Sequence, residues 1–486
     1  MAKLVLTHAY FLRYDQKQWD TGLPYPPLGT LYAASTLRSV GHEVNFVDMM
    51  FAHSPIDIAP ALTDAPEFFI IYDDGFNYLT KMCLTNMREA AFKMIRLAKK
   101  NNCTVIISGS DSTDHCQQYH EQGADYVLIG EAEQTLSELI DALEKKQDVQ
   151  SVRGISLARS DGQYVKTAPR PVMRDLDSIP FPAWDMIDIE PYRERWMKNA
   201  GYFSLNVGTT RGCPYKCNWC AKPIYGNRYN ARSPQDVVDE LKMMKGMFAM
   251  DHIWFCDDIF GLKPGWVQEF ATLVEQEKLS FRFKIQSRAD LLVQEQYVEA
   301  LARAGCDQVW MGAESGSQKI LDAMDKGITI AQIRKATELL RQHQIRPCFF
   351  IQFGYLGETR EDIDLTIRMI NELLPDDIGI SVSYPLPGTV FHERVKEQLK
   401  QKANWTDSNE MALMFHNTFP ASFYKHLHHH VHRKYRKQLA LQSTKKLFQH
   451  PFTAKWVTIR KALTAVYLAP SVILSSWRLK KLEKAS

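Results

Sequence analysis

The feature that most constrains the fold of this 486-residue chain is a repeated alternation of short apolar segments with helical patterns, in two successive series. The strand-like segments of the first series are 4–7, 44–47, 68–72, 105–107 and 126–129. The clearest helical patterns between them are 87–99 and 135–143. Continuous apolar strands that alternate with helices are typical of a parallel sheet covered on both faces. Residues 1–150 are therefore predicted to form a doubly wound, Rossmann-like α/β domain.

The second series spans residues 196–400. Its strand-like segments are 205–209, 253–255, 281–285, 308–311, 348–353 and 379–382. Helices between them have start signals, such as Ser233 before a proline and Thr359 before a pair of acids. A complete eight-unit barrel needs about 250 residues, so a partial (β/α)6 barrel is predicted. Residues 151–195 are predicted to be a linker and residues 401–486 a helical tail.

Charge and cysteine usage narrow the class of protein. The formal net charge is only +3, and no nucleic-acid partner is predicted. No secretory leader is visible at the start, and no segment approaches the about 20 apolar residues of a membrane span. Nine cysteines in such a long chain do not form a disulfide framework, so a cytoplasmic protein with free thiols is expected.

Three of the cysteines, Cys213, Cys217 and Cys220, have the spacing C-x3-C-x2-C directly after the first strand of the second series. Three thiolates on one short loop suit an iron–sulfur cluster and leave one iron open. A structural zinc site needs four ligands, and no second pair lies nearby in the sequence. A redox pair of Cys217 and Cys220 leaves Cys213 unexplained. The motif therefore predicts a [4Fe-4S] cluster whose open iron binds S-adenosylmethionine (SAM).

With this motif after the first barrel strand, residues 203–395 resemble the radical SAM superfamily. The resemblance implies that an electron from the cluster cleaves SAM and starts radical chemistry. It also implies SAM contacts at the carboxyl ends of the strands, where the matching residues are Trp219, Asp257, Asp258, Arg288, Glu314 and Ser315. Two alternatives stay open. Asp257 and Asp258 could be a helix N-cap pair, and Arg288 or Glu314 could serve structural ion pairs.

The domain before the barrel resembles that of the cobalamin-binding radical SAM enzymes. The resemblance depends on Pro26-Pro27-Leu28-Gly29, on the linker 175–182 and on polar segments after two strands. It implies a cobalamin site at Ser108, Gly109, Ser110, Gly130 and Glu131. No G-x-G-x-x-G follows an early strand, so a dinucleotide site is not predicted. No D-x-H-x-x-G motif offers a cobalt ligand, and a lower face without histidine is expected. The alternative is a domain that kept its fold and lost cobalamin.

These features predict a cobalamin-dependent radical SAM methyltransferase that acts on an unactivated carbon of a small-molecule or lipid-like substrate. A second hypothesis is an oxidative cyclase of the tetrapyrrole-ester type, whose two-domain layout is similar. A third is a cluster-bearing protein that binds a partner without catalysis. The enzyme hypotheses imply an electron donor such as a flavodoxin or a ferredoxin.

The C-terminal tail is strongly basic. Residues 425–486 contain fourteen Lys and Arg against one acid, Glu483. Apolar residues recur at helical spacing among these cations, including Trp456, Tyr467 and Trp477. An apolar face with a basic rim is typical of a helix that lies on an anionic membrane, so peripheral membrane contact is one hypothesis. The other is a helix packed on the barrel with a basic outer face.

Overall fold

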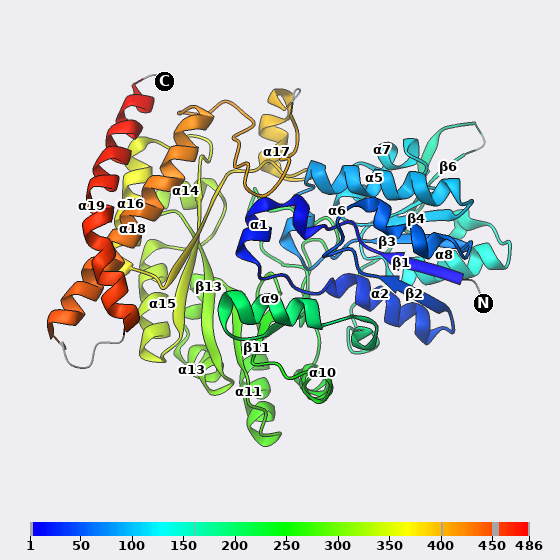
Figure 1. Cartoon of the computed structure of the whole chain (residues 1–486), viewed down its shortest axis with the longest axis horizontal. Coiled ribbons are helices and arrows are strands. Elements are labelled where there is room, and N and C mark those ends of the chain that lie inside the picture. The colour runs from blue at the N-terminus through cyan, green and yellow to red at the C-terminus, as the bar shows by residue number, and fades with distance from the viewer. Residues whose placement is uncertain (1–2, 160, 400–401, 450–455, 485–486) are drawn as a thin grey trace.

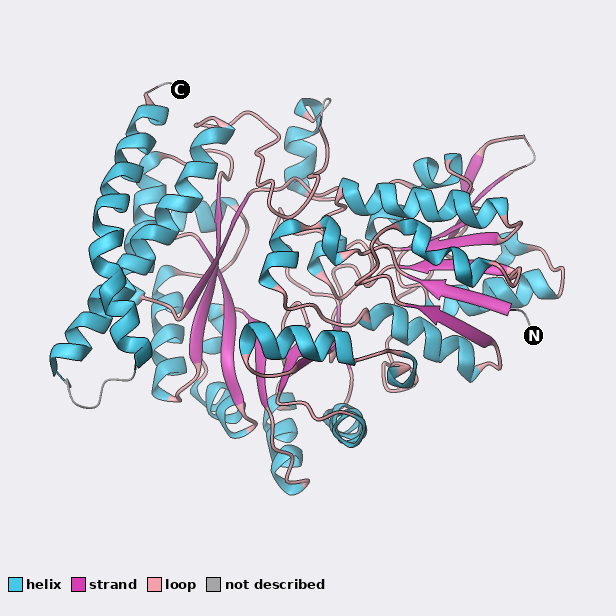
Figure 2. Ribbon diagram, in the orientation of Figure 1, coloured by secondary structure: helices cyan, strands magenta, loops and turns pink. Residues whose placement is uncertain are grey.

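The structure is a computed structural model that describes residues 3–159, 161–399, 402–449 and 456–484. An N-terminal α/β domain and a barrel lie side by side, and two long helices cover the far side of the barrel (Figure 1). The strands of the two sheets are the magenta elements of Figure 2, each with helices around it. The predicted α/β class and its three-part order are confirmed.

The N-terminal sheet has seven strands in the order β2-β1-β3-β4-β5-β6-β7. The first five are parallel, and the last two form an antiparallel hairpin. The strands are β1 (Lys3–Thr7), β2 (Glu43–Val47), β3 (Phe68–Tyr72), β4 (Thr104–Ser108), β5 (Tyr126–Leu128), β6 (Ile155–Ala158) and β7 (Tyr164–Lys166). The segment predicted as a linker therefore begins with two strands of this sheet.

Helices cover both faces of the N-terminal sheet, as the continuous apolar strands predicted. Leu4 and Leu6 of β1 belong to a buried cluster with α2 (Leu28–Ser39) and α8 (Glu133–Glu144). Val5, between them, belongs to a second cluster on the opposite face. That face is covered by α5 (Thr85–Lys100) and α7 (Cys116–Glu121), with the shorter helices α1 (Gln16–Thr21), α3 (Ala59–Leu62), α4 (Tyr78–Lys81) and α6 (Ser110–Asp114) in the connections.

The barrel sheet has six parallel strands in chain order, from β8 at one edge to β15 at the other. The strands are β8 (Ser204–Val207), β11 (His252–Phe255), β12 (Arg282–Ser287), β13 (Cys306–Glu314), β14 (Arg346–Phe353) and β15 (Asp377–Val382). Since each neighbour in the chain is also the neighbour in space, the predicted partial (β/α)6 barrel is confirmed. Its helices are α9 (Glu190–Ala200), α10 (Pro234–Met247), α11 (Trp266–Gln276), α12 (Ala289–Leu292), α13 (Glu295–Arg303), α14 (Gln318–Ala323), α15 (Ile330–Gln342), α16 (Arg360–Leu373) and α17 (Val390–Val395).

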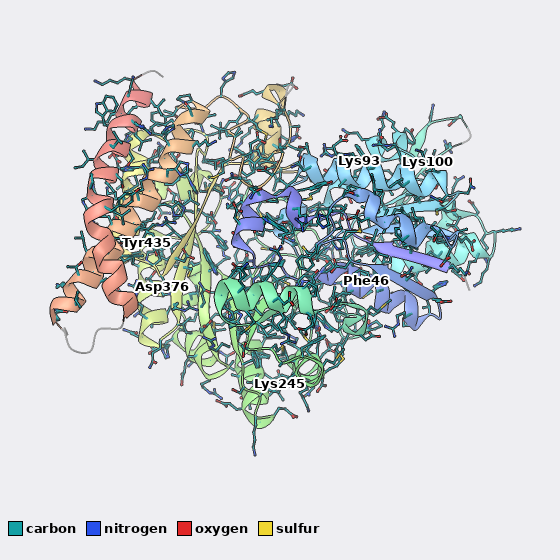
Figure 3. All side chains as sticks on the ribbon, in the orientation of Figure 1. Phe46, Lys93, Lys100, Lys245, Asp376 and Tyr435 are labelled. Atoms are coloured by element: carbon teal, nitrogen blue, oxygen red, sulfur yellow. The ribbon has the colours of Figure 1, made fainter. Side chains whose placement is uncertain are left out.

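The C-terminal tail folds into two long helices, α18 (Ala421–Gln449) and α19 (Trp456–Glu483), which lie against each other (Figure 1). Both helices of the hairpin contact the barrel. The Tyr435 hydroxyl donates a hydrogen bond to the carbonyl of Pro375 at 2.7 Å, beside Asp376 (Figure 3). Arg360 pairs with Glu483 at 2.9 Å. Among the helices described, none combines the length and the apolar character that crossing a bilayer requires.

Candidate active site

The cysteine loop leaves the barrel at the carboxyl end of β8 and is closed by a short antiparallel ladder. In this ladder, β9 (Thr210–Arg211) pairs with β10 (Asn230–Ala231). Gly212, the first residue inside the loop, has φ +81°, and a Cβ there would lie 2.3 Å from the carbonyl oxygen of Arg228. Only glycine fits a position that is both left-handed and this crowded. The ladder and this glycine hold the ends of the cysteine loop together.

The three cysteines of the loop are free thiols with graded exposure. Cys213 is buried, and Cys217 and Cys220 are partly exposed. Burial raises the pKa of Cys213 and raises that of Cys220 to about 11. Within the described ranges, no three His, Cys, Asp or Glu side chains gather closely enough to bind a single metal ion. In a four-iron cluster each thiolate binds its own iron, so the sulfurs need not converge on one point. The donor set fits such a cluster.

Asn218 anchors the cysteine loop to the ends of the fourth and fifth barrel units. Its side-chain nitrogen donates to the Ala323 carbonyl and to Asp325, both at 2.8 Å. Its side-chain oxygen accepts a hydrogen bond from the hydroxyl of Tyr355 at 2.6 Å. Its backbone N–H donates to the Met324 carbonyl at 3.1 Å. No local pattern predicts a role for Asn218, because its partners lie more than 100 residues away along the chain.

Arg288, predicted to contact SAM, lies against the cysteine loop. Its guanidinium carbon is 3.6 Å from the ring centroid of Tyr215, and Nη1 is 3.9 Å from the sulfur of Cys217. Nε and Nη2 pair with Asp290 at 3.0 and 3.1 Å, and Nη2 also donates to the Lys326 carbonyl at 2.8 Å. Arg288 therefore forms the structural ion pair and also lies beside the cysteine loop.

Glu314 and Trp219 both lie beside a buried lysine, Lys326, that no sequence motif marks. Lys326 Nζ pairs with Glu314 at 2.7 Å and lies 5.9 Å from the ring centroid of Trp219. Burial alone would lower the pKa of Lys326, but the Glu314 carboxylate raises it above its usual value. Glu314 has φ +57°, an uncommon backbone for a residue with a side chain. The indole N–H of Trp219 is buried without a partner among the described residues, so it is free to donate to a bound molecule.

The adjacent aspartates after β11 have different surroundings. Asp257 is buried, and its carboxylate accepts hydrogen bonds from the backbone N–H groups of Thr209 and Thr210 at 2.7 and 2.8 Å. It therefore fixes the turn that leads into the cysteine loop. Asp258 is more accessible and pairs with Lys81 of the N-terminal domain at 2.9 Å.

Ser315, the remaining residue with a predicted SAM contact, faces α16. Its hydroxyl lies 3.1 Å from that of Thr366 and accepts from the backbone N–H of Ser317 at 3.1 Å. The hydroxyl of Ser315 is thus occupied by hydrogen bonds within the protein, and these bonds fix the turn that follows Glu314.

The carboxyl edge of the N-terminal sheet faces the cysteine loop. Arg211, at the base of the loop, is buried between Glu131 and Glu133, with Nη2 2.8 Å from Glu133 and Nη1 in direct contact with Glu131. A Cβ on Gly130, which has φ +76°, would lie 3.5 Å from the carbonyl of Ile224, at the end of the loop. Glu131, predicted to bind cobalamin, thus joins the two domains.

The other residues predicted to bind cobalamin follow β4. Ser108 and Ser110 are buried, and a Cβ on Gly109 would lie 3.0 Å from Asp73. The hydroxyls of Ser110 and Thr113 and Nδ1 of His115 are buried without partners among the described residues. Such groups suit a ligand that supplies hydrogen bonds, so this edge fits a cofactor.

The nearby His120 is not available as a ligand. Its ring nitrogens bond to the Ala124 carbonyl at 2.8 Å and to Ser156 at 3.0 Å, and its ring stacks on Tyr164.

Comparison with known proteins agrees with this geometry. Residues 207–370 match the model of the radical SAM superfamily. The chain is 28% identical over 392 residues to an uncharacterized methyltransferase of Pyrococcus horikoshii. This match covers 79% of this chain and 82% of that protein. It is 28% identical over 326 residues to the anaerobic magnesium-protoporphyrin IX monomethyl ester cyclase of Synechocystis, over 66% of this chain and 63% of the cyclase.

Among solved structures, the cobalamin-dependent SAM radical enzyme OxsB with aqua-cobalamin bound superposes with a TM-score of 0.73. The match covers 100% of this chain and 76% of OxsB at 16% identity. At that identity the likeness concerns the fold, including the placement of a doubly wound domain before a partial barrel.

The fold and the site define an enzyme whose barrel presents a three-cysteine loop to a doubly wound domain. Residues 207–370 match the radical SAM superfamily and contain the three-cysteine loop, and the chain is an enzyme that uses a [4Fe-4S] cluster and SAM.

Proposed function

We propose that this protein is a cobalamin-dependent radical SAM methyltransferase that transfers a methyl group to an unactivated carbon of a small hydrophobic molecule. The observation that carries the proposal is the contact between the carboxyl edge of the N-terminal sheet and the cysteine loop. Arg211 with Glu131 and Glu133, and Lys81 with Asp258, fix this contact. The similarity to a methyltransferase and to the fold of a cobalamin enzyme supports it.

In this proposal Cys213, Cys217 and Cys220 hold the cluster, and Trp219, Asp258, Arg288 and Glu314 lie around SAM. Residues 108–110 and Gly130 of the N-terminal edge hold cobalamin. When bound, the cluster supplies the electron that cleaves SAM, and cobalamin supplies the methyl group. Asn218 and Asp257 position the cysteine loop from behind. Lys326 pairs with Glu314 and holds its carboxylate beside the ring of Trp219.

The test is methyl transfer from labelled SAM with anaerobically reconstituted protein, cobalamin and reduced flavodoxin or ferredoxin as the predicted electron donor. With SAM labelled in its methyl group, label is expected in a product, together with unlabelled S-adenosylhomocysteine and 5′-deoxyadenosine. The Ser110→Trp variant, whose bulk would fill the predicted cofactor edge, should lose cobalamin and methyl transfer but keep its iron. Wild-type protein that binds no cobalamin at micromolar concentration would contradict the proposal.

An oxidative cyclase is the second candidate, favoured by the similarity to the Synechocystis cyclase. The same experiment separates the two. A cyclase forms 5′-deoxyadenosine and a product that gains a ring but carries no label from the SAM methyl group. A methyltransferase delivers the label to the product.

We also propose that the outer face of α19 contacts an anionic membrane. Four large apolar side chains are exposed on the described part of the helix, and at 100° per residue they lie on one side of it. They are Tyr467, Ile473, Leu474 and Trp477. Arg478, Lys480 and Lys481 lie among them and are exposed. Each cation near an anionic bilayer contributes about 1 kcal/mol. The side chain of Trp456, also expected on this surface, lies outside the described side chains.

Cosedimentation with vesicles tests the membrane contact. The protein is expected to bind vesicles that contain phosphatidylserine at low salt and to be released at high salt, because salt screens the attraction. Replacing both Ile473 and Trp477 by Ser should abolish binding. Leu441→Ser, at a single exposed leucine on α18, should leave it unchanged. Equal binding of the double variant and the wild type would contradict the contact.

A further inference from the structure

The inner face of the barrel sheet is partly accessible, unlike its outer face. On β12, Phe283 and Ile285 are fully buried in the main core, whereas Lys284 and Gln286 between them keep accessible surface. The same alternation continues on β13, where Val309 and Met311 are fully buried while Trp310 is partly accessible. Alternate side chains of a strand point to opposite faces of the sheet. The accessible residues therefore form the inner surface of the barrel.

Lys284 is a cation on this inner surface without an ion-pair partner in the described part of the chain. Its ammonium lies 5.4 Å from the ring centroid of Tyr25, 5.8 Å from that of Trp196 and 5.5 Å from that of Trp254. Asp307, an acid close enough to affect it, already pairs with Arg346 at 3.0 Å. Burial lowers the pKa of Lys284 to about 8, so at neutral pH it remains mostly protonated.

An apolar wall stands beside this lysine on the neighbouring strands. The rings of Trp310 on β13 and Phe350 on β14 stack with their centroids 4.8 Å apart. Phe350 is 37% exposed, although it stands on the inner face of a barrel strand. Gly379 on β15 leaves room for both rings, because a Cβ there would lie 3.2 Å from each. The wall presents a flat aromatic surface that no described side chain fully covers.

We propose that the inner barrel binds an anionic, flat apolar substrate, with Lys284 holding its acidic group and Trp310 and Phe350 stacking on its body. The inference rests on the proposed function insofar as it takes the inner barrel as the substrate site. A desolvated cation without an anionic partner is costly, and a carboxylate, phosphate or sulfonate would offset that cost. Stacking on aromatic side chains favours a planar body.

The position of Lys284 also limits the shape of the substrate. It precedes Arg288 by four residues, which at about 3.3 Å per residue places it roughly 13 Å below the cysteine loop along the strand. The acidic group therefore binds far from the carbon that reacts near the loop. Anionic molecules with a rigid polycyclic or aromatic body between the two ends meet this requirement.

Two fluorescent probes test the inference without knowledge of the natural substrate. Anilinonaphthalene sulfonate is a flat aromatic anion, and phenylnaphthylamine is the same ring system without the sulfonate. Equilibrium dialysis measures their affinities for the full-length, cluster-containing protein. Lys284→Gln is expected to weaken binding of the anionic probe about tenfold, since a charge-assisted contact of about 1.4 kcal/mol is lost. The neutral probe should bind Lys284→Gln and the wild type equally.

Three further variants control the experiment. Lys284→Arg keeps the charge and should bind the anionic probe within threefold of the wild type. Lys93→Gln changes an exposed lysine on α5 (Figure 3) and should change neither affinity. Replacing both Trp310 and Phe350 by Ala removes the apolar wall and should weaken binding of both probes. Lys284→Gln could instead weaken binding of both probes equally, or of neither. In either case the three aromatic rings alone stabilise the Lys284 ammonium, and the inference is wrong.

Iron content and SAM cleavage, measured on the same samples, report on the proposed function separately. Protein that discriminates between the probes but shows no methyl transfer would refute the proposed function and leave the anion site standing. Protein that transfers methyl groups but does not discriminate would refute only the anion site.

Discussion

Replacing Arg211 by Met is expected to destabilise the contact between the two domains strongly. Arg211 is 3% exposed and is the cation shared by Glu131 and Glu133, which are 7% and 3% exposed. Removing one partner of a buried ion pair costs about 3–5 kcal/mol, because the other charge is left uncompensated in a poorly polar site. Here two carboxylates are left together, so a loss of about 4–5 kcal/mol in the free energy of unfolding is expected.

Replacing the two carboxylates as well separates the effect of uncompensated charge on stability from the effect of lost packing. In a triple variant with Arg211→Met, Glu131→Gln and Glu133→Gln, no buried charge remains without a partner. Most of the lost stability should therefore return, as in other proteins whose buried ion pairs are replaced by neutral groups. Arg303→Met is the matched control. Its partner Glu275 is 47% exposed, and an exposed pair contributes less than about 1 kcal/mol.

The assay is urea unfolding of the four proteins, followed by tryptophan fluorescence and circular dichroism. Iron content is measured in parallel, because Arg211 also stands at the base of the cysteine loop. A loss below about 1 kcal/mol for Arg211→Met would refute the reasoning, since such a value belongs to an exposed pair. A triple variant no more stable than Arg211→Met would show that packing of the arginine, and not uncompensated charge, causes the effect.

Three more outcomes are expected. Cys217→Ala should lose the four-iron cluster, measured as iron per protein, whereas Cys256→Ala, at a buried cysteine outside the loop, should keep it. Asn218→Ala should lower stability by roughly 2–3 kcal/mol and speed loss of iron on dilution, because three short side-chain hydrogen bonds disappear. Burial raises the pKa of Glu358 to about 8 from an ordinary value of 4.5. The folded state therefore binds a proton more tightly than the unfolded state, and stability should fall by several kcal/mol between about pH 4.5 and 8. Glu358→Gln should remove that part of the pH dependence in thermal unfolding, and unchanged curves would contradict the assignment.

The elements and the cluster motif could be predicted because their signals are local. Apolar runs such as 68–72 report a buried strand wherever it lies, and Ser233 and Thr359 cap helices as expected. The spacing of Cys213, Cys217 and Cys220 lies within eight residues, so the chain itself keeps the thiols near one another. The hairpin of β6 and β7 joins the N-terminal sheet because β6 pairs antiparallel with β5, and no local pattern shows that pairing.

The predicted site residues divide according to how far away their partners lie. Asp257 and Asp258 are adjacent in the sequence, yet one holds a turn of the barrel and the other reaches Lys81 of the other domain. Glu131 was predicted as a cofactor contact and is found on Arg211, 80 residues away. No sequence pattern predicts these different contacts, because each depends on which side chain the fold places next to the carboxylate.

By itself the sequence determined the α/β class, the order of the two sheets, the cysteine loop and the helical tail, because hydrophobic period, caps and spacing act over a few residues. Only the tertiary structure decided that Lys326 pairs with Glu314, that Asn218 anchors the loop and that Lys284 lies among three aromatic rings. A lysine within a strand pattern shows only that the position is polar. Whether that lysine meets water, a carboxylate or an aromatic wall is set by the curvature of the sheet and by segments that arrive from distant parts of the chain.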